Sequence, residues 1–214
     1  MSIKRALPKP FEMIAGHPAL DFVNSIDDRF ADGGPVELLT TYDDLLRFVS
    51  QAELITERQF RELKKLEPSL VERSKVVAQA VHLREALAAI LYAILDHQEP
   101  AKAALLDVET IFKDAAGHRR LVFKHTNGAE LPSGLVWEYK GVATEIQSPV
   151  WLLAEAANNL LTSPQAGLIR KCASTTCQWL FLDTSKNHTR RWCDMKICGN
   201  RNKARRFHLR QAAG

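Results

Sequence analysis

The chain has 214 residues, of which 46% are hydrophobic and 25% are charged, and its formal net charge is +4. These values are ordinary for a globular protein with one sizeable core and a small additional module. No apolar run approaches the roughly 20 residues of a membrane span, and residues 1–16 lack the apolar centre of a secretory signal. We therefore expect a cytoplasmic protein with no membrane partner.

The first predicted element is a helix that begins at Pro18 and runs to about Ser25. Asp21 and Asn24 are polar positions in this otherwise apolar run. They could line a ligand pocket or fix a neighbouring loop. The alternative that we favour is that they cap the helix and brace it against the core.

Three helices are predicted next, and the first two follow a capping residue. Thr41 precedes a helix from residue 42, and Thr56 with Gln59 forms a capping box before the second. The third is the longest, from Ser69 to Gln98, with apolar residues recurring at spacings of three and four. Arg84 lies near its middle. It could bind an anionic ligand, although an ion pair is the interpretation we favour.

The remaining elements of this part are a helix from Lys102 to Asp114, two strands at residues 120–125 and 135–140, and a helix from Val150 to Leu161. The strands predict a hairpin whose aromatic side chains either form a ligand shelf or pack over the helices. The break at residues 162–167 marks the predicted boundary between an α-rich domain, residues 1–167, and a C-terminal module, residues 168–214. The predicted class is therefore mainly α with a small β-hairpin.

All four cysteines lie in the C-terminal module, as two C-x(4)-C pairs separated by fifteen residues. Two thiolate pairs bridged by a hairpin-length segment fit one tetrahedral zinc ion that stabilises the fold. Disulfide bonds in a secreted protein are the alternative. The predicted zinc ligands are Cys172, Cys177, Cys193 and Cys198.

The residues between and after the cysteines predict a treble-clef-like zinc finger. Residues 179–182 are expected to form a short strand, and residues 190–192 return as its partner. A helix is expected from Cys198 onward because the following residues contain no proline.

The C-terminal module is strongly basic. It contains eleven Lys or Arg and two acidic residues, a net charge of +9, whereas residues 1–167 carry a net charge of −5. Such asymmetry predicts a polyanionic partner, with DNA the first candidate. A solvated basic tail without a specific partner is the alternative. The candidate nucleic-acid-binding residues are Arg190, Arg191, Arg201, Lys203, Arg205, Arg206 and Arg210.

Two stretches resemble known families. Residues 190–205, RRWCDMKICGNRNKAR, resemble the signature of the CGNR zinc-finger family, named for the tetrad Cys198, Gly199, Asn200 and Arg201. Residues 16–29, GHPALDFVNSIDDR, resemble the opening of the ABATE domain that usually precedes this finger, with Ser25 where threonine is commoner. The resemblance implies a bacterial DNA-binding regulator of transcription that responds to stress.

The sequence contains none of the common enzyme signatures, neither a phosphate-binding loop nor a nucleophile elbow nor an H-E-x-x-H motif. We therefore expect no catalytic activity. The leading hypothesis is a transcription regulator whose finger binds DNA and whose N-terminal domain senses a small-molecule effector or forms a homodimer. The alternative is an interaction module that binds RNA or an acidic protein surface.

Overall fold

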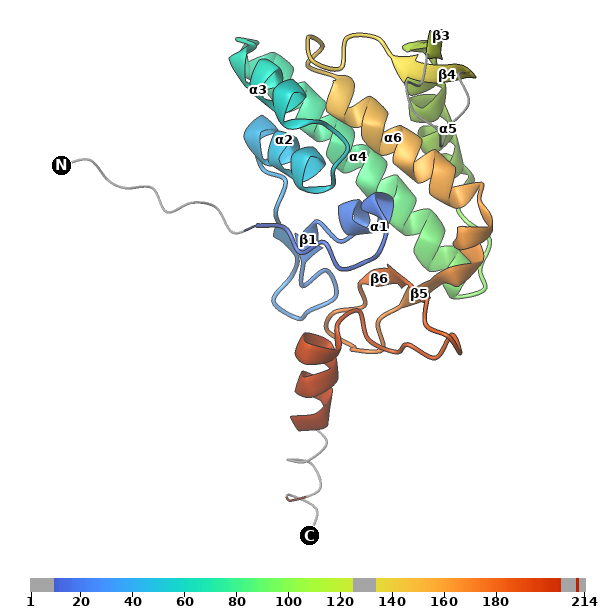
Figure 1. Ribbon diagram of the computed structural model, residues 1–214. Coiled ribbons are helices and arrows are strands. Elements are labelled where there is room, and N and C mark those ends of the chain that lie inside the picture. The colour runs from blue at the N-terminus through green and yellow to red at the C-terminus, as the bar shows by residue number, and fades with distance from the viewer. Residues whose placement is uncertain (1–9, 125–133, 205–210, 212–214) are drawn as a thin grey trace, which may run out of the picture.

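The computed structural model describes residues 10–124, 134–204 and 211 (Figure 1). Within them the helices α1 to α6 and a C-terminal helical segment, residues 195–204, are accompanied by three short antiparallel strand pairs, which confirms the predicted mainly α class. The helices are α1 (Pro18–Val23), α2 (Tyr42–Gln51), α3 (Glu57–Lys65), α4 (Leu70–Leu95), α5 (Lys102–Gly117) and α6 (Ser148–Leu161). The strands are β1 (Ile26–Asp27), β2 (Val36–Glu37), β3 (Arg119–Lys124), β4 (Gly134–Tyr139), β5 (Ile169–Lys171) and β6 (Leu180–Leu182).

The starts of α2, α3 and α4 follow from local hydrogen bonding. Thr41, Thr56 and Ser69 each accept a hydrogen bond from the backbone three residues later, and the side chain at that later position bonds back to the cap. Such reciprocal capping satisfies N–H groups that the helix itself cannot pair. The helix α4 ends earlier than predicted, at Leu95, because the chain turns there through His97, whose φ is +56°.

The long helix α4 is the centre of the fold. It packs against α1, α2, α5 and α6, and its buried side chains include Leu83, Leu87 and Leu91. By length and composition alone α4 could span a membrane. Its apolar character is explained here by the helices that surround it, because a helix in contact with neighbours on several sides needs few polar positions.

The hairpin of β3 and β4 lies beside α5 and α6 (Figure 1). Its register pairs Leu121 with Trp137. The ring centroids of Tyr139 and of Trp151 in α6 lie 6.3 Å apart, so this end of the hairpin packs on the helices, the second of the two predicted arrangements. Trp137 is 59% exposed, so the distal part of the aromatic face stays open to solvent. Residues 125–133, which connect the two strands, lie outside the described residues.

The C-terminal module shares its core with the rest of the chain. Its buried residues Ile169, Phe181 and Leu182 belong to the same apolar cluster as the helices. The backbone N–H of Leu182 also donates to the carbonyl of Ala15 at 2.8 Å. The two parts of the chain therefore pack around one continuous interior.

Candidate metal centre

The first cysteine pair is presented by the β5–β6 hairpin. Cys172 directly follows β5, and its N–H donates to the carbonyl of Trp179 at 2.9 Å. Cys177 lies in the connecting turn, where Gln178 adopts a positive φ of +53°. β6 pairs with β5 and not with residues 190–192, so the predicted strand partner is wrong. Residues 190–192 contribute one backbone hydrogen bond, from Ala173 N–H to Arg191 C=O.

The second pair is presented by the start of the C-terminal helix. The Asp194 side chain accepts a hydrogen bond from Ile197 N–H at 2.8 Å and caps a single π-helical turn, η2 (Met195–Gly199), that holds Cys198. Helical residues continue to position 204. This helix therefore starts three residues before the predicted Cys198. At Gly199 a Cβ atom would lie 2.5 Å from Met195 Sδ, so a glycine fits the close contact.

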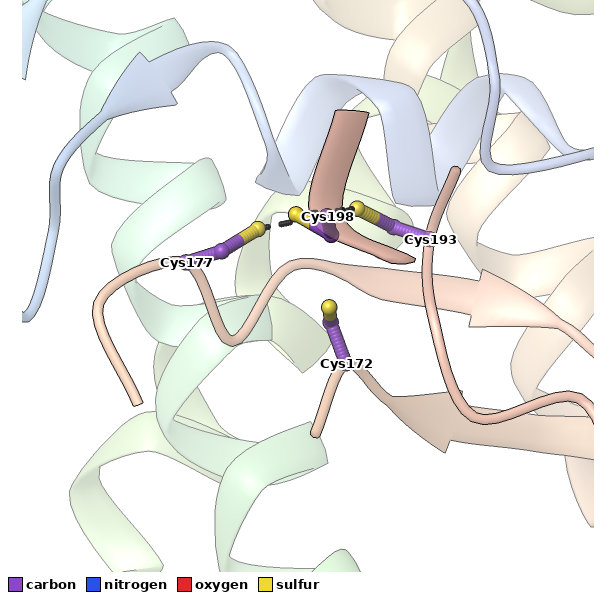
Figure 2. Close-up of side chains that lie close together, drawn as sticks. All are labelled: Cys172, Cys177, Cys193 and Cys198. Atoms are coloured by element: carbon purple, nitrogen blue, oxygen red, sulfur yellow. Dashed lines mark hydrogen bonds between the residues drawn. The ribbon is translucent and has the colours of Figure 1, made fainter. Parts of the chain in front are cut away.

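The four sulfur atoms converge on one point (Figure 2). All lie within 4.8 Å of one another, and Cys193 Sγ is 3.6 Å from both Cys177 Sγ and Cys198 Sγ. A tetrahedron with Zn–S bonds of about 2.3 Å has S···S edges of roughly 3.8 Å. The spacing fits zinc, and all four cysteines are free. The predicted single structural zinc ion with four cysteine ligands is confirmed as the cofactor that this cluster accommodates.

Four ionised thiolates this close together would repel one another without a cation. Hydrogen bonds from Cys177 and Cys193 lower the pKa of Cys172, whereas hydrogen bonding to Cys172 raises the pKa of both Cys177 and Cys193. One thiolate therefore forms readily, and further ionisation beside it is opposed. A divalent ion removes this repulsion and holds all four thiolates together, which makes its binding energy part of the folding energy.

Arg190 and Asp183 organise the loop that carries Cys193. The guanidinium of Arg190 lies 4.3 Å from the Phe181 ring centroid and donates to the carbonyls of Trp192, Leu182, Ile14 and Cys193. Asp183 is fully buried and accepts from Ser185 N–H and Arg190 N–H at 3.1 and 3.0 Å. Both residues therefore stabilise the fold around the metal.

The metal centre is fixed to the N-terminal helices by side-chain hydrogen bonds. Asn24 is 3% exposed and uses both ends of its amide on Leu180, donating to its carbonyl at 2.8 Å and accepting from its N–H at 2.9 Å. Trp179 Nε1 donates to Ile26 C=O at 3.3 Å, and Tyr92 Oη donates to Gln178 C=O at 3.0 Å. The finger is thus held as a rigid extension of the helical body.

The predicted nucleic-acid-binding residues fall into three groups. Arg191, Arg201 and Lys203 are exposed. Arg190, in contrast, is half-buried with its donors on backbone carbonyls, so the structure gives it a packing role. Arg205, Arg206 and Arg210 lie outside the described residues. Arg201 also lines a cavity of about 200 Å³ beside Cys177, Cys193 and Cys198, and the acidic Asp27 and Asp28 line the same cavity.

The predicted ligand-binding or structural residues of the N-terminal domain have structural partners. Arg84 is 1% exposed and forms ion pairs with Glu37 at 2.5 Å and Glu85 at 2.8 Å, which confirms the ion-pair interpretation. Asp21 accepts from Ala15 N–H at 2.9 Å, and burial raises its pKa to about 6. Asp21 and Asn24 also line a cavity of about 210 Å³, so a cavity remains beside them although both side chains brace the fold.

Several residues that attach the finger carried no signal in the sequence. Tyr92 lies in the last turn of α4 and Asp96 directly follows it, yet Tyr92 bonds to the finger backbone and Asp96 pairs with Lys171 at 2.6 Å. Trp179 was expected only as a strand residue. A lone tyrosine or acidic residue near a helix end is ordinary, so no pattern marks these contacts.

Comparison with protein families assigns both parts of the chain. Residues 16–164 match the ABATE model, described as "Putative stress-induced transcription regulator", and residues 169–211 match the CGNR zinc finger. No curated protein matches the chain at the threshold applied. Because the ABATE match spans more than half of the sequence, the chain belongs to the ABATE family and carries a CGNR zinc finger.

Proposed function

We propose that this ABATE-family protein is a cytoplasmic transcription regulator that binds double-stranded DNA through its zinc-held finger. The observation that carries the proposal is the separation of charge, +9 in residues 168–214 against −5 in residues 1–167. A double helix is a dense row of phosphates, and clustered Lys and Arg release its counterions on binding. The exposed Arg191, Arg201 and Lys203 supply such cations.

The placement of the C-terminal helix supports this role. The helix begins at the metal centre and leaves the body at the end of the molecule opposite the β3–β4 hairpin (Figure 1). A projecting helix with exposed cations can contact phosphates or enter a major groove without a clash with the body. Because the finger is bonded to α1 and α4, its orientation toward DNA is set by the N-terminal domain.

The acidic N-terminal domain restricts where DNA can lie. Asp27 and Asp28 line the cavity that Arg201 borders, and phosphates would be repelled from them. We therefore assign DNA contact to the finger alone. The N-terminal domain has the complementary task of sensing an effector or forming a homodimer, and we assign no enzymatic activity to either part.

Fluorescence anisotropy with a labelled random duplex tests the proposal. The double variant Arg201→Gln/Lys203→Gln removes two exposed finger cations, and Arg61→Gln/Lys65→Gln on α3 is the matched control, since those side chains are 67% and 69% exposed. The finger variant should weaken binding and reduce the slope of log K against log salt by about two units, because each phosphate contact contributes roughly 0.9. The control should bind like the natural protein.

Two results would count against DNA as the partner. Equal losses in both double variants would mean that binding reflects overall charge and not the finger. A single-stranded RNA competitor that displaces the duplex at equal or lower concentration would favour the RNA-binding alternative.

A further inference from the structure

An apolar groove lies between α4, α5 and α6, next to the β3–β4 hairpin. Its volume is about 560 Å³, within the range of about 300–1,000 Å³ typical of small-molecule sites. Most of its lining is aliphatic or aromatic. The apolar lining residues are Ile90, Ile94, Leu105, Val108, Phe112, Ala115, Ala116, Tyr139, Ala154 and Leu161.

The charged residues of the groove are paired, but one donor is not satisfied. Lys113 pairs with Glu109, and Arg119 pairs with Glu155 at 3.3 Å through Nη2. The Nε of Arg119 is buried, and within the described part of the chain it has no hydrogen-bond partner. An unmet buried donor costs about 1–3 kcal/mol, more when it is charged. A ligand that supplies an acceptor there would recover this energy.

We propose that this groove binds a small organic anion with an apolar body and a carboxylate head. The apolar body would occupy the space between the helices, and a carboxylate oxygen would accept a hydrogen bond from Arg119 Nε. A planar carboxylate matches the geometry of the planar guanidinium. A nucleotide fits poorly, because the groove offers a largely apolar lining and its second cation, Lys113, is paired with Glu109.

The groove borders the elements that hold the metal centre. Ile94 lines it from the last turn of α4, the segment from which Tyr92 and Asp96 bond to the finger. Leu161 lines it from the end of α6, and the chain then continues through η1 (Pro164–Leu168) into β5 and Cys172. A ligand here would contact both supports of the finger. That regulatory consequence rests on the proposed function, whereas ligand binding itself does not.

Isothermal titration calorimetry of the full-length zinc-loaded protein, without DNA, tests the site. The probes are octanoate, octan-1-ol and octylamine, which share one chain length and differ in head-group charge. Octanoate should bind saturably with one site per chain and about tenfold more tightly than octan-1-ol, because one charge-assisted hydrogen bond is gained beside the opposing charge of Glu155. Octylamine should bind more weakly than octanoate.

Variants locate the site. Leu105→Glu places a negative charge in the groove at a position already 45% exposed, whereas Leu106→Glu places the same charge outside it at a position 62% exposed. Only Leu105→Glu should abolish octanoate binding. Glu155→Gln removes the opposing charge and should strengthen octanoate binding several-fold without changing octan-1-ol binding. Arg119→Gln should reduce octanoate to the affinity of octan-1-ol.

Three outcomes would overturn the proposal. These are no saturable octanoate binding, equal affinities for octanoate and octan-1-ol, or equal losses in Leu105→Glu and Leu106→Glu. Thermal unfolding followed by circular dichroism confirms that each variant is folded, so a loss of binding can be assigned to the groove.

Discussion

Asn24→Ala is the change that most directly tests how the finger is held. Asn24 contributes two hydrogen bonds to the backbone of Leu180, and both residues are buried. Alanine at position 24 would leave the backbone N–H and C=O of Leu180 in β6 without these hydrogen-bond partners. At about 1–3 kcal/mol for each of the two unsatisfied groups, the expected loss is about 2–6 kcal/mol. Water entering from the adjacent cavity would bring the loss toward the lower value.

Urea unfolding measures this loss. A domain with an unfolding free energy of about 5–15 kcal/mol would lose a large fraction of its stability. Because the finger and the helices share one core, circular dichroism at helical wavelengths and tryptophan fluorescence should report one transition, shifted to lower urea by about 1 M or more. The control is Asn159→Ala, which removes an exposed amide on α6 and should change little.

The reasoning would be refuted by two separate transitions, with the helical signal of Asn24→Ala unfolding at the midpoint of the natural protein. That result would mean that the finger unfolds independently and that its contacts with α1 do not stabilise the body.

Three further changes have defined outcomes. Cys198→Ser should lower the zinc content, measured by mass spectrometry, from one ion per chain to well below one, and should destabilise the helices because the core is shared; full zinc occupancy would contradict the ligand assignment. Arg84→Met should cost less than the roughly 3–5 kcal/mol of a fully buried broken pair, because Glu37 is 34% exposed and Glu85 keeps Arg29 as a partner. Burial alone would raise the pKa of Glu37, but Arg84 together with the backbone N–H groups of Leu39 and Leu38 lowers the net pKa. The natural protein should therefore lose stability as the pH falls through that lowered pKa, and the variant should lose less. Asp21→Asn keeps an acceptor for Ala15 N–H. Because burial raises the Asp21 pKa to about 6, the natural protein should lose stability as the pH rises from about 4 to about 6. The variant should not show this loss in urea titrations across the same range.

Features that depend on neighbouring residues in the chain could be predicted from the sequence. The caps Thr41 and Thr56 need only a partner three residues later, and both capping boxes form. The metal site could be predicted for the same reason, since each cysteine pair spans one short turn. The pairing of the strands could not be predicted in the same way. β5 has three residues, too few to show an alternating pattern, so the sequence does not identify β5 as the partner of β6.

Contacts between distant segments could not be predicted. Asn24 and Leu180 are 156 residues apart, and nothing in either segment specifies the other. Arg190 and Arg191 are adjacent and chemically identical, yet the first is enclosed by backbone carbonyls and the second is exposed. The two side chains differ in exposure because the fold brings residues 14, 182 and 193 around Arg190. The groove at Arg119 likewise requires α4, α5 and α6 together.

The central claim is that zinc holds a basic finger that binds DNA, and a salt series on the natural protein tests it most directly. Binding to a labelled duplex would be measured from low to physiological salt, with and without a zinc chelator. The account predicts tight binding at low salt, a steep linear fall of log K with log salt, and loss of binding on chelation. Binding that is absent at low salt, or that survives complete removal of zinc, would contradict it.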